Sequence, residues 1–486
     1  MSANEDTPLR LDLPQAVEQV RLVLDKAGYS EDVVRETLNA APASLRQVSR
    51  LPFWLWQTRQ GAPLDVLVRL FLLGQPVDRA AARRAVTPMD LTQWAELGLV
   101  ETAGETVTAA VQLVPDQGLV AAVDWPGRPA DAWKQVMGIA ASTRALLQCT
   151  IRRPAGLALD LGAGCGIQAF HAARHCERVV GVDLNPRAVH LARFNAQLNG
   201  LANVEFREGD FFEPVRGQQF DLILANPPFL IAPRTAHLFN DSGMKGDALC
   251  QKLVRTAPEF LRDGGFCQIV SNFAMLRGQE WRGRLAGWFK GTGCAAWVLN
   301  FRTEEVALYA GNQLRQAEGE ESAERFNEWM AYYEQEGIEA IGFGLITMRR
   351  RAGGGNWVQC SDAPPVQGPC GAAILGGFDR FDFLERARDD QVLLAARLRP
   401  APDLRLDQEL TPAAGAWSPA KSSLRLGSGL TFAGNADERT LALVARCRGQ
   451  ERLRDILTDL AGPGADVRGG LALVRRLLAN GMLVPE

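Results

Sequence analysis

Paired cysteine motifs, long apolar runs and an excess of one charge are all missing from this 486-residue sequence. Its nine cysteines are an odd number, and no two of them form a C-x-x-C motif. A disulfide framework or a zinc site built on such motifs therefore has no support. We expect reduced, mostly buried thiols. We also expect no metal site, because His171 and His175 have no third ligand in a recognised motif.

The near balance of charges limits the possible partners. The net charge is −3 and the pI is about 6.0, so no overall positive field attracts nucleic acid, and any such contact needs a local basic patch. The first ten residues, MSANEDTPLR, carry acids where a signal peptide has basic and then apolar residues. No uncharged apolar run reaches about 18 residues. We therefore expect a cytoplasmic protein with no membrane partner.

Composition and length predict a globular protein of several domains. Hydrophobic residues make up 47% of the chain and charged residues 22%, which is typical of a soluble protein. A chain of this length exceeds one ordinary core. The patterns along it divide into four regions. We predict a helical, winged-helix-like domain over 1–130, a catalytic domain over 131–352, a linker and irregular or β region over 353–430, and a small winged-helix-like module over 431–486.

The region 131–352 alternates strand-like and helix-like segments. Apolar strand patterns occur in GLALDLGAG, RVVGVDL, VEFREGD, FDLILANPP and FCQIVSNF, with helical patterns between them. Such alternation predicts an α/β domain with a mostly parallel sheet covered on both faces. Two later segments, CAAWVLNFR and IEAIGFGLITMRR, predict an antiparallel pair at the end of the sheet, separated by an acidic helical insertion.

Unusual residues follow four successive strands of this region. The turn from Asp160 to Gly166 ends the first strand, and Asp183, Asp210 and the segment Asn226–Phe229 end the next three. Ligands of open α/β sheets bind beyond the carboxyl ends of the strands, where glycines allow close approach and a carboxylate can accept hydrogen bonds from ribose. The pattern therefore predicts a nucleoside cofactor.

The spacing of the glycines separates two cofactor classes. A dinucleotide fingerprint has the pattern G-x-G-x-x-G, but here the third glycine comes one residue early and Ile167 occupies its place. The Asp160 carboxylate would repel a pyrophosphate and attract a cation. A sulfonium nucleoside fits better than NAD, which disfavours an oxidoreductase.

These motifs resemble the class I S-adenosylmethionine (SAM)-dependent methyltransferases, in particular the small-domain group with an Asn-Pro-Pro-aromatic motif. That group includes HemK-type protein-glutamine methyltransferases, RsmC-like enzymes acting on guanine N2 of ribosomal RNA, and adenine-N6 methyltransferases. The resemblance covers about residues 138–350 and is carried by LDLGAGCGIQAFHAARH, VVGVDLNPRAVHLARFNAQLNG and FDLILANPPF. It implies a Rossmann-like class I methyltransferase sheet, and the whole chain resembles large bacterial methyltransferases with extra domains at both ends.

The resemblance also implies roles for single residues. The glycine turn would surround the methionine part of SAM, Asp183 would hold the ribose, and Asp210 with Phe211 would flank the adenine. Thr143 and Arg144 would lie in a loop over the cofactor. The full set implied to bind SAM is Asp160, Gly162, Ala163, Gly164, Gly166, Asp183, Leu184, Asp210, Phe211, Asn226 and Thr143.

The turn Asn226-Pro227-Pro228-Phe229 suggests how a methyl group could be transferred. An amide or aryl amine is a poor nucleophile because its lone pair is delocalised, so it must be aimed at the sulfonium methyl. The Asn226 side-chain oxygen and the Pro227 carbonyl can accept hydrogen bonds from a target NH₂. Pro228 and Phe229 are predicted to contact the substrate, with Phe229 stacking on its flat group. Asn226, Pro227 and Phe229 are thus the predicted catalytic residues.

Several functions remain open from the sequence. The preferred hypothesis is an N-methyltransferase acting on a macromolecule, either an RNA base amine or a protein glutamine amide, with a partner in the translation machinery. The alternative is a catalytically degenerate SAM-binding protein that acts as a partner-binding module. Neither the substrate nor the oligomeric state follows from the sequence.

Overall fold

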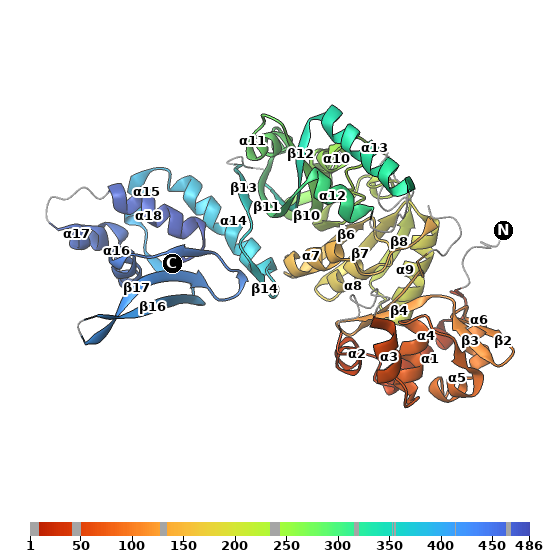
Figure 1. Ribbon diagram of the computed structural model, residues 1–486. Helices are drawn as coiled ribbons and strands as arrows, with labels where there is room; N and C mark the ends of the chain where they lie inside the picture. The colour runs from red at the N-terminus through yellow and green to blue at the C-terminus, as the bar shows by residue number, and fades with distance from the viewer. Residues whose placement is uncertain are drawn as a thin grey trace.

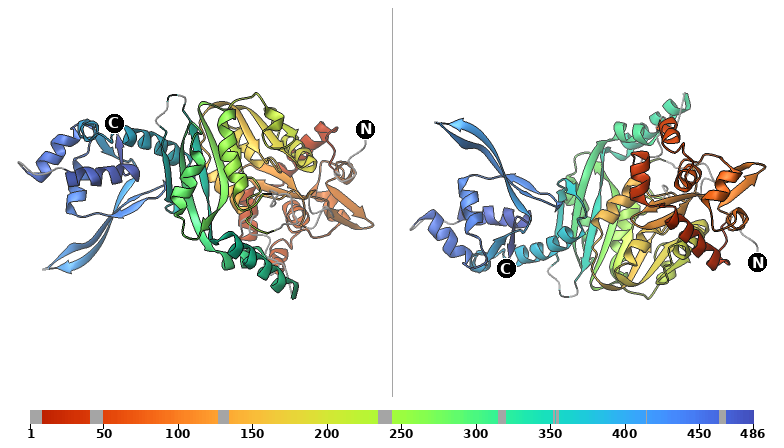
Figure 2. Two further views of the ribbon diagram at one scale, coloured as in Figure 1. Left: turned by 90° about the horizontal axis from the view of Figure 1, so that it is seen from above. Right: turned by 90° about the horizontal axis from the view of Figure 1, so that it is seen from below.

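The computed structural model places three parts of the chain in a row, with the sheet-containing middle part between two smaller ends (Figures 1 and 2). It describes residues 9–40, 50–126, 134–233, 244–314, 320–351, 353, 356–413, 415–462 and 468–486. Within these residues, no helix is both long and apolar enough to cross a membrane.

The middle part is built on an eight-stranded sheet of order β13-β11-β12-β10-β9-β6-β7-β8. Strands β8, β7, β6, β9 and β10 run parallel, which confirms the expected mostly parallel sheet. The expected antiparallel pair forms between β11 and β12, and β12 also pairs antiparallel with β10. The pair is not at the end of the sheet, because β13 forms the edge. The strands are β6 (Ala155–Leu161), β7 (Cys176–Asp183), β8 (Val204–Glu208), β9 (Phe220–Ala225), β10 (Leu261–Leu276), β11 (Cys294–Glu305), β12 (Ile338–Arg350) and β13 (Val358–Asp362).

Helices cover both faces of this sheet because its strands are apolar on both sides. Neighbouring residues such as Ala158 and Leu159 in β6 point into two different hydrophobic clusters, as the two-residue period of a strand requires. The cluster around Ala158 includes residues of α7 (Ala141–Cys149), α8 (Ile167–Ala172) and α9 (Pro186–Leu198). The cluster around Leu159 includes α10 (Ala248–Thr256), α11 (Trp281–Ala286) and the 3-10 turns at 213–215, 257–260 and 287–289.

The acidic insertion between β11 and β12 is helical, as expected. It forms α12 (Val306–Gln313) and α13 (Glu320–Glu336). The buried side chains of Tyr309, Trp329 and Tyr333 pack with Ile231, which follows the Asn-Pro-Pro-Phe turn. The Tyr333 hydroxyl donates to the Ile231 carbonyl over 2.8 Å. This insertion therefore supports the segment that leaves the candidate site.

The N-terminal part has the element order expected of a winged helix, with helices α1 to α3 in front of it. After α4, the strand β1 and the helices α5 and α6, the chain forms the hairpin β2–β3, and the three strands pair antiparallel in the order β1-β3-β2. Its elements are α1 (Pro14–Lys26), α2 (Glu31–Leu38), α3 (Leu51–Gln57), α4 (Pro63–Phe71), β1 (Val77–Asp78), α5 (Arg79–Ala85), α6 (Leu91–Glu96), β2 (Val100–Ala103) and β3 (Thr106–Ala109).

A second hairpin joins the N-terminal part to the sheet-containing part. It consists of β4 (Gln112–Asp116) and β5 (Leu119–Val123) and packs on α9. The Asn195 side chain of α9 exchanges hydrogen bonds of 2.7 and 3.0 Å with the backbone of Ala122. One hydrophobic cluster runs through both parts. The expected boundary near residue 130 lies outside the described residues.

Residues 353–430 contain more regular structure than expected from their glycine and proline content. β13 extends the central sheet, and a 16-residue helix, α14 (Gly371–Arg386), follows it. Ile374, Phe378 and Phe381 of α14 are buried at positions i, i+4 and i+7, a helical period that the surrounding glycines obscured. Arg351 pairs with Asp382 of α14 at 2.6 Å, and Arg349 also pairs with Asp382. These contacts hold α14 against the sheet.

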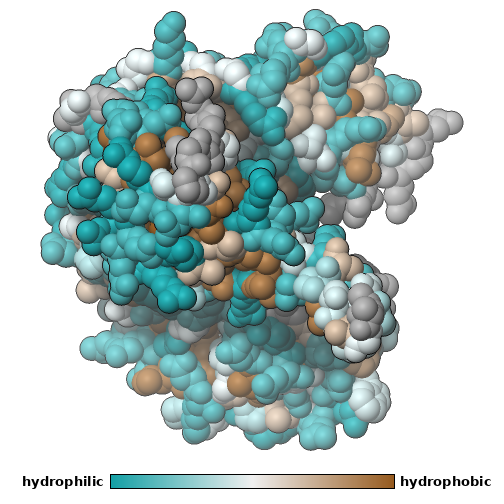
Figure 3. Space-filling model, turned by 90° about the vertical axis from the view of Figure 1, so that its left-hand side faces the viewer, coloured by the Kyte–Doolittle hydropathy of each residue, from teal (hydrophilic) through white to brown (hydrophobic). Residues whose placement is uncertain are grey.

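The C-terminal part contains a long hairpin and a small helical unit. The hairpin, β16 (Leu404–Ala413) with β17 (Ala416–Leu426), carries the exposed Trp417. Figure 3 shows that this end of the molecule is mostly hydrophilic, with separate hydrophobic patches. The remaining elements are β14 (Val366–Gln367), α15 (Asp390–Ala395), β15 (Leu398–Pro400), β18 (Gly429–Leu430), β19 (Ala433–Asn435), α16 (Glu438–Arg446), α17 (Leu453–Ala461), α18 (Arg468–Ala479) and β20 (Leu483–Pro485).

Candidate active site

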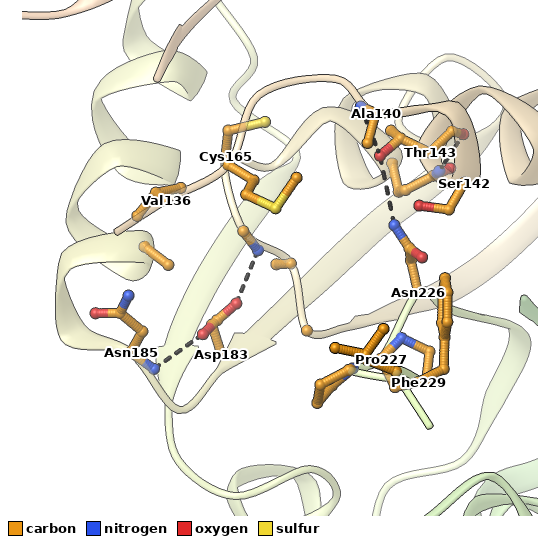
Figure 4. A pocket seen from close by; sticks show the side chains of 18 of the residues that line it. Val136, Ala140, Ser142, Thr143, Cys165, Asp183, Asn185, Asn226, Pro227 and Phe229 are labelled. Carbon is orange, nitrogen blue, oxygen red and sulfur yellow. Dashed lines mark hydrogen bonds between the residues drawn. The ribbon is translucent and has the colours of Figure 1, made fainter. Parts of the chain in front are cut away.

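A cavity of about 790 Å³ lies beyond the carboxyl ends of β6, β7, β8 and β9. Figure 4 shows Asn226, Pro227 and Phe229 on one side of it and Asp183 with Asn185 on the other. The structure thus brings together most of the residues implied from the sequence. Those that line the cavity are Thr143, Gly162, Ala163, Gly164, Asp183, Leu184, Asp210, Phe211, Asn226, Pro227, Pro228 and Phe229.

The glycine turn after β6 has a backbone that only glycine adopts readily. Gly162 and Gly164 have φ angles of 69° and 54°. A Cβ atom added to Gly164 would meet no atom within 4 Å, so the chain leaves open space there. Gly166 differs, because it does not line the cavity and its Cβ would lie 2.5 Å from the Phe170 ring. Gly166 is therefore required for packing at the start of α8.

Asp183 holds the turn and faces the cavity. One of its carboxylate oxygens accepts the Gly164 N–H at 2.8 Å and the other accepts the Asn185 N–H at 2.9 Å. Burial raises the pKa of Asp183, although both hydrogen bonds oppose the shift. A carboxylate has about four lone-pair positions, so two remain for hydroxyl donors such as those of a ribose. These two free acceptor positions fit the hydroxyl groups of a nucleoside cofactor's sugar.

Asp160 lies beneath the turn and does not line the cavity. Its side chain is 1% exposed and accepts the Ala169 N–H of α8 at 3.0 Å. Burial, with a smaller contribution from the charge of Asp183, raises the pKa of Asp160 to about 7. The contact with the cofactor that the resemblance implied for Asp160 stays a prediction.

Asp210 and Phe211 follow β8 and line the cavity, as the resemblance implied. Phe211 has a φ of 42°, which is uncommon for a residue with a side chain. Together with the neighbouring Gly209, the two residues form the side of the cavity next to β7. This position suits a flat ring that extends from a sugar held by Asp183.

The Asn226 side chain is anchored through its amide nitrogen. Asn226 Nδ2 donates to Thr143 Oγ1 of α7 over 3.4 Å, and the backbone N–H of Ala140 donates to the same oxygen (Figure 4). Because the nitrogen has this partner, the side-chain oxygen of Asn226 remains available to accept a hydrogen bond. Thr143, implied as a cofactor contact, thus also has a contact with the predicted catalytic residue.

A second wall of the cavity was not predicted from the sequence. It comes from β10, β11, β12 and α12 through Asn272, Arg302, Tyr309, Gln313 and Phe343. The rings of Phe229 and Phe343 lie 6.0 Å apart, the Arg302 guanidinium is 5.0 Å from the Phe343 ring, and Asn272 donates to the Tyr309 hydroxyl at 2.9 Å. The segment IVSN within β10 offered a signal for Asn272, but no local pattern predicted that the other four residues would lie here.

The entrance to α7 forms a third wall, and the N-terminal part supports it from behind. Residues 135–138 and 140–143 line the cavity. Arg144, implied as a cofactor contact, points elsewhere and pairs with Asp116 at 3.2 Å and with Glu31 at 3.6 Å. His171 of α8 contacts the same Asp116 at 3.0 Å. Within the described residues, no group of three or more His, Cys, Asp and Glu side chains is arranged to hold a metal ion.

The sheet order and the position of the cavity at the carboxyl ends of the parallel strands define a Rossmann-like α/β domain. Residues 137–292 match the family model of the methyltransferase small domain. Residues 26–110 and 376–485 match two further families, each described as a domain of unknown function. This match confirms the resemblance to the methyltransferase small domain family that the sequence predicted for the central part of the chain.

Individual relatives share this central part. The release factor glutamine methyltransferase of Aliivibrio fischeri is 33% identical over 170 residues, which are 32% of this chain and 55% of that protein. The ribosomal RNA small subunit methyltransferase C of Alcanivorax borkumensis is 31% identical over 117 residues, which are 24% of this chain and 32% of that protein. The chain spans about half the length of the curated relatives that it matches.

Solved structures also show similarity at low identity. A SAM-dependent methyltransferase from Thiobacillus denitrificans, in complex with S-adenosyl-L-homocysteine, is 19% identical, and the match covers 44% of this chain and 92% of that one. The TM-score is 0.27.

Replacing Asp160 by Asn should stabilise the protein at high pH. The folded protein keeps a proton on Asp160 up to about pH 7, whereas an unfolded Asp releases it near pH 3.9. The wild type should therefore lose stability as the pH rises between these values, and Asp160→Asn should not. At pH 8 we expect the free energy of unfolding to increase by about 1–3 kcal/mol relative to the wild type. Urea unfolding of both proteins at pH 5 and pH 8 measures the free energy of unfolding. The same difference between variant and wild type at both pH values would contradict a raised pKa of Asp160.

Proposed function

We propose that this protein is a SAM-dependent N-methyltransferase that acts on a planar amide or amine nitrogen of a macromolecule. The observation that carries the proposal is the shared cavity, because Asn226–Phe229 lines the same space as the glycine turn and Asp183. SAM would lie along the glycine turn with its ribose at Asp183 and its adenine beside Asp210 and Phe211. When bound, it supplies an electrophilic methyl group on a sulfonium.

The chain's own residues would bind and aim the acceptor nitrogen. With its amide nitrogen held by Thr143, Asn226 presents its oxygen to one N–H of the target, and the Pro227 carbonyl can accept the other. These acceptors orient the lone pair and stabilise the positive charge that develops on nitrogen. Phe229, which packs near Phe343, offers an apolar surface for the flat group that carries the nitrogen. The two prolines hold this turn rigid before the substrate binds.

The charges around the cavity favour a polypeptide amide over an RNA base. Its lining includes the carboxylates of Asp183 and Asp210, while Arg302 pairs with Glu304 at 3.2 Å. A phosphate backbone is bound by clusters of unpaired Lys and Arg, which the described lining does not provide. A glutamine side chain of a protein brings no negative charge of its own. A protein of the translation machinery is the candidate substrate, because one relative is named for methylating a release factor.

Transfer of a labelled methyl group tests the function and the substrate class together. The purified protein is incubated with SAM carrying a tritiated methyl group and with cell extract, and the acid-insoluble label is then digested with protease or with ribonuclease. We expect label that protease releases and ribonuclease does not. The matched control is Asn226→Ala, which should transfer little label while binding SAM as the wild type does.

Other outcomes have distinct meanings. Label released by ribonuclease would show that RNA is the substrate and would overturn the preference for protein. SAM binding without transfer to any fraction would favour the alternative of a SAM-binding partner module. Absence of SAM binding, measured by calorimetry, would overturn the cofactor assignment and the proposed function with it.

A further inference from the structure

Two cysteines from distant parts of the sequence meet in the interior. Cys149 ends α7, and Cys370 caps the start of α14, 221 residues later. Their sulfur atoms lie 3.0 Å apart, and the side chains are 2% and 0% exposed. All nine cysteines are free thiols and eight are buried, as expected from the sequence. The sequence offered no sign that these two are neighbours.

The backbones on both sides of the pair are held in place. The Cys370 N–H donates to the Gln148 carbonyl at 2.7 Å, and the buried Gln268 of β10 donates to the Cys149 carbonyl at 2.8 Å. Gly371 lies so close to the other segment that an added Cβ would be 1.9 Å from the Thr150 carbonyl oxygen. These contacts hold the backbones of the two cysteines next to each other at the start of α14.

We propose that Cys149 and Cys370 are a dithiol site that a hydroperoxide converts to an internal disulfide. A disulfide has a sulfur–sulfur distance of about 2.05 Å, so the thiols must approach by about 1 Å. The backbones next to the two cysteines are already in contact, so the sulfur atoms can approach without a movement of whole helices. The link would join the end of α7, whose first turn lines the candidate active site, to the C-terminal part of the chain.

The chemistry balances with one equivalent of hydroperoxide. Contact with Cys149 lowers the pKa of Cys370, which favours Cys370 over Cys149 as the sulfur that loses its proton and attacks the peroxide oxygen. The attack breaks the O–O bond and gives a sulfenic acid, and the released hydroxide takes up the proton lost by the Cys370 thiol to form water. The Cys149 sulfur then attacks the Cys370 sulfur and displaces hydroxide, which takes up the thiol proton as water. With hydrogen peroxide, two thiols and one peroxide give one disulfide and two water molecules.

Peptide mapping of the full-length protein tests the site. The native protein is treated with hydrogen peroxide, its remaining thiols are blocked with iodoacetamide in denaturant, and it is digested without reductant for mass spectrometry. We expect one linked peptide that contains Cys149 and Cys370 and disappears on reduction. The linked protein should also unfold at a Tm higher by several degrees, because the crosslink closes a loop of more than 200 residues.

Cys360 provides the matched control, because it is the one cysteine that is only partly buried. If exposure alone governed the reaction with peroxide, Cys360 would be the first cysteine to be oxidised, and Cys360→Ser would remove most of the oxidation. We expect Cys360→Ser to form the linked peptide as the wild type does, and Cys370→Ser to form none. Recovery of both Cys149 and Cys370 as alkylated thiols after peroxide treatment of the wild type would overturn the proposal, whatever the folding of the variants.

Discussion

Asn226→Ala is expected to lower kcat by about 10²–10³-fold while leaving SAM affinity nearly unchanged. The lost oxygen interacts most strongly with the target nitrogen as that atom gains positive charge, so the loss appears in kcat rather than in KM. Asn226 is only partly buried and its side chain bonds to Thr143 alone within the described residues, so the fold should persist. Steady-state kinetics on the identified substrate, with SAM affinity measured by calorimetry, provide the measurement.

Variants of Thr143 show whether the anchor of Asn226 matters. Thr143→Ser keeps the hydroxyl and should retain most of the activity, whereas Thr143→Val removes it at similar volume and should lower kcat. A merely structural role would affect stability in Thr143→Val without separating the kcat values of the two variants. Wild-type kcat in Asn226→Ala would contradict the catalytic assignment and leave the turn with a structural role.

Asp124→Ala is expected to lower the free energy of unfolding by about 3–5 kcal/mol. Asp124 follows β5 and is 4% exposed, and its carboxylate binds the Arg187 guanidinium of α9 with a shortest distance of 2.6 Å. It also accepts the N–H of Val136, which lines the cavity, at 2.8 Å. Removing it takes the carboxylate away from the buried Arg187 guanidinium and leaves the Val136 N–H without its acceptor. Chemical unfolding followed by circular dichroism provides the measurement.

An exposed ion pair gives the matched control. Glu339 pairs with Arg277 at 3.2 Å, but both side chains are more than half exposed. Glu339→Ala should therefore change the stability by about 1 kcal/mol or less. Equal effects of Asp124→Ala and Glu339→Ala would show that the N-terminal part does not depend on the buried pair. A large effect of Asp124→Ala alone would support a role of the Asp124–Arg187 pair in holding the N-terminal part against α9.

Features that depend on adjacent residues could be predicted from the sequence, whereas contacts between distant segments could not. The glycine turn and the Asn-Pro-Pro-Phe turn depend on dihedral preferences of adjacent residues, so their position at strand ends could be predicted. Asp160 shows the limit of that reasoning. Its place next to the turn was apparent, but its side chain is buried, accepts a hydrogen bond from Ala169 of α8 and does not line the cavity. Its role depends on a packing contact that no motif specifies.

The prediction of irregular or β structure for residues 353–430 missed the helix α14 for a related reason. Glycine and proline are read as signs of a loop because of their backbone preferences. In α14, however, Gly377 lies where an added Cβ would be 2.3 Å from the Trp297 ring, so the glycine allows a helix to approach β11 closely. Asp382 of the same helix meets Arg351 at the end of β12. Tertiary contacts thus outweighed a weak local propensity for helix.

The alternating α/β pattern, the glycine turn and the Asn-Pro-Pro-Phe turn each depend on residues that are neighbours in the chain, so they could be predicted from the sequence. The second wall of the cavity with Asn272, Arg302 and Phe343, the bond from Asn226 to Thr143 and the contact of Cys149 with Cys370 became apparent only in the folded protein. These contacts join distant segments that strand order and helix packing bring together. Strand order and helix packing depend on how apolar surface from the whole chain is buried, and local sequence patterns do not specify that.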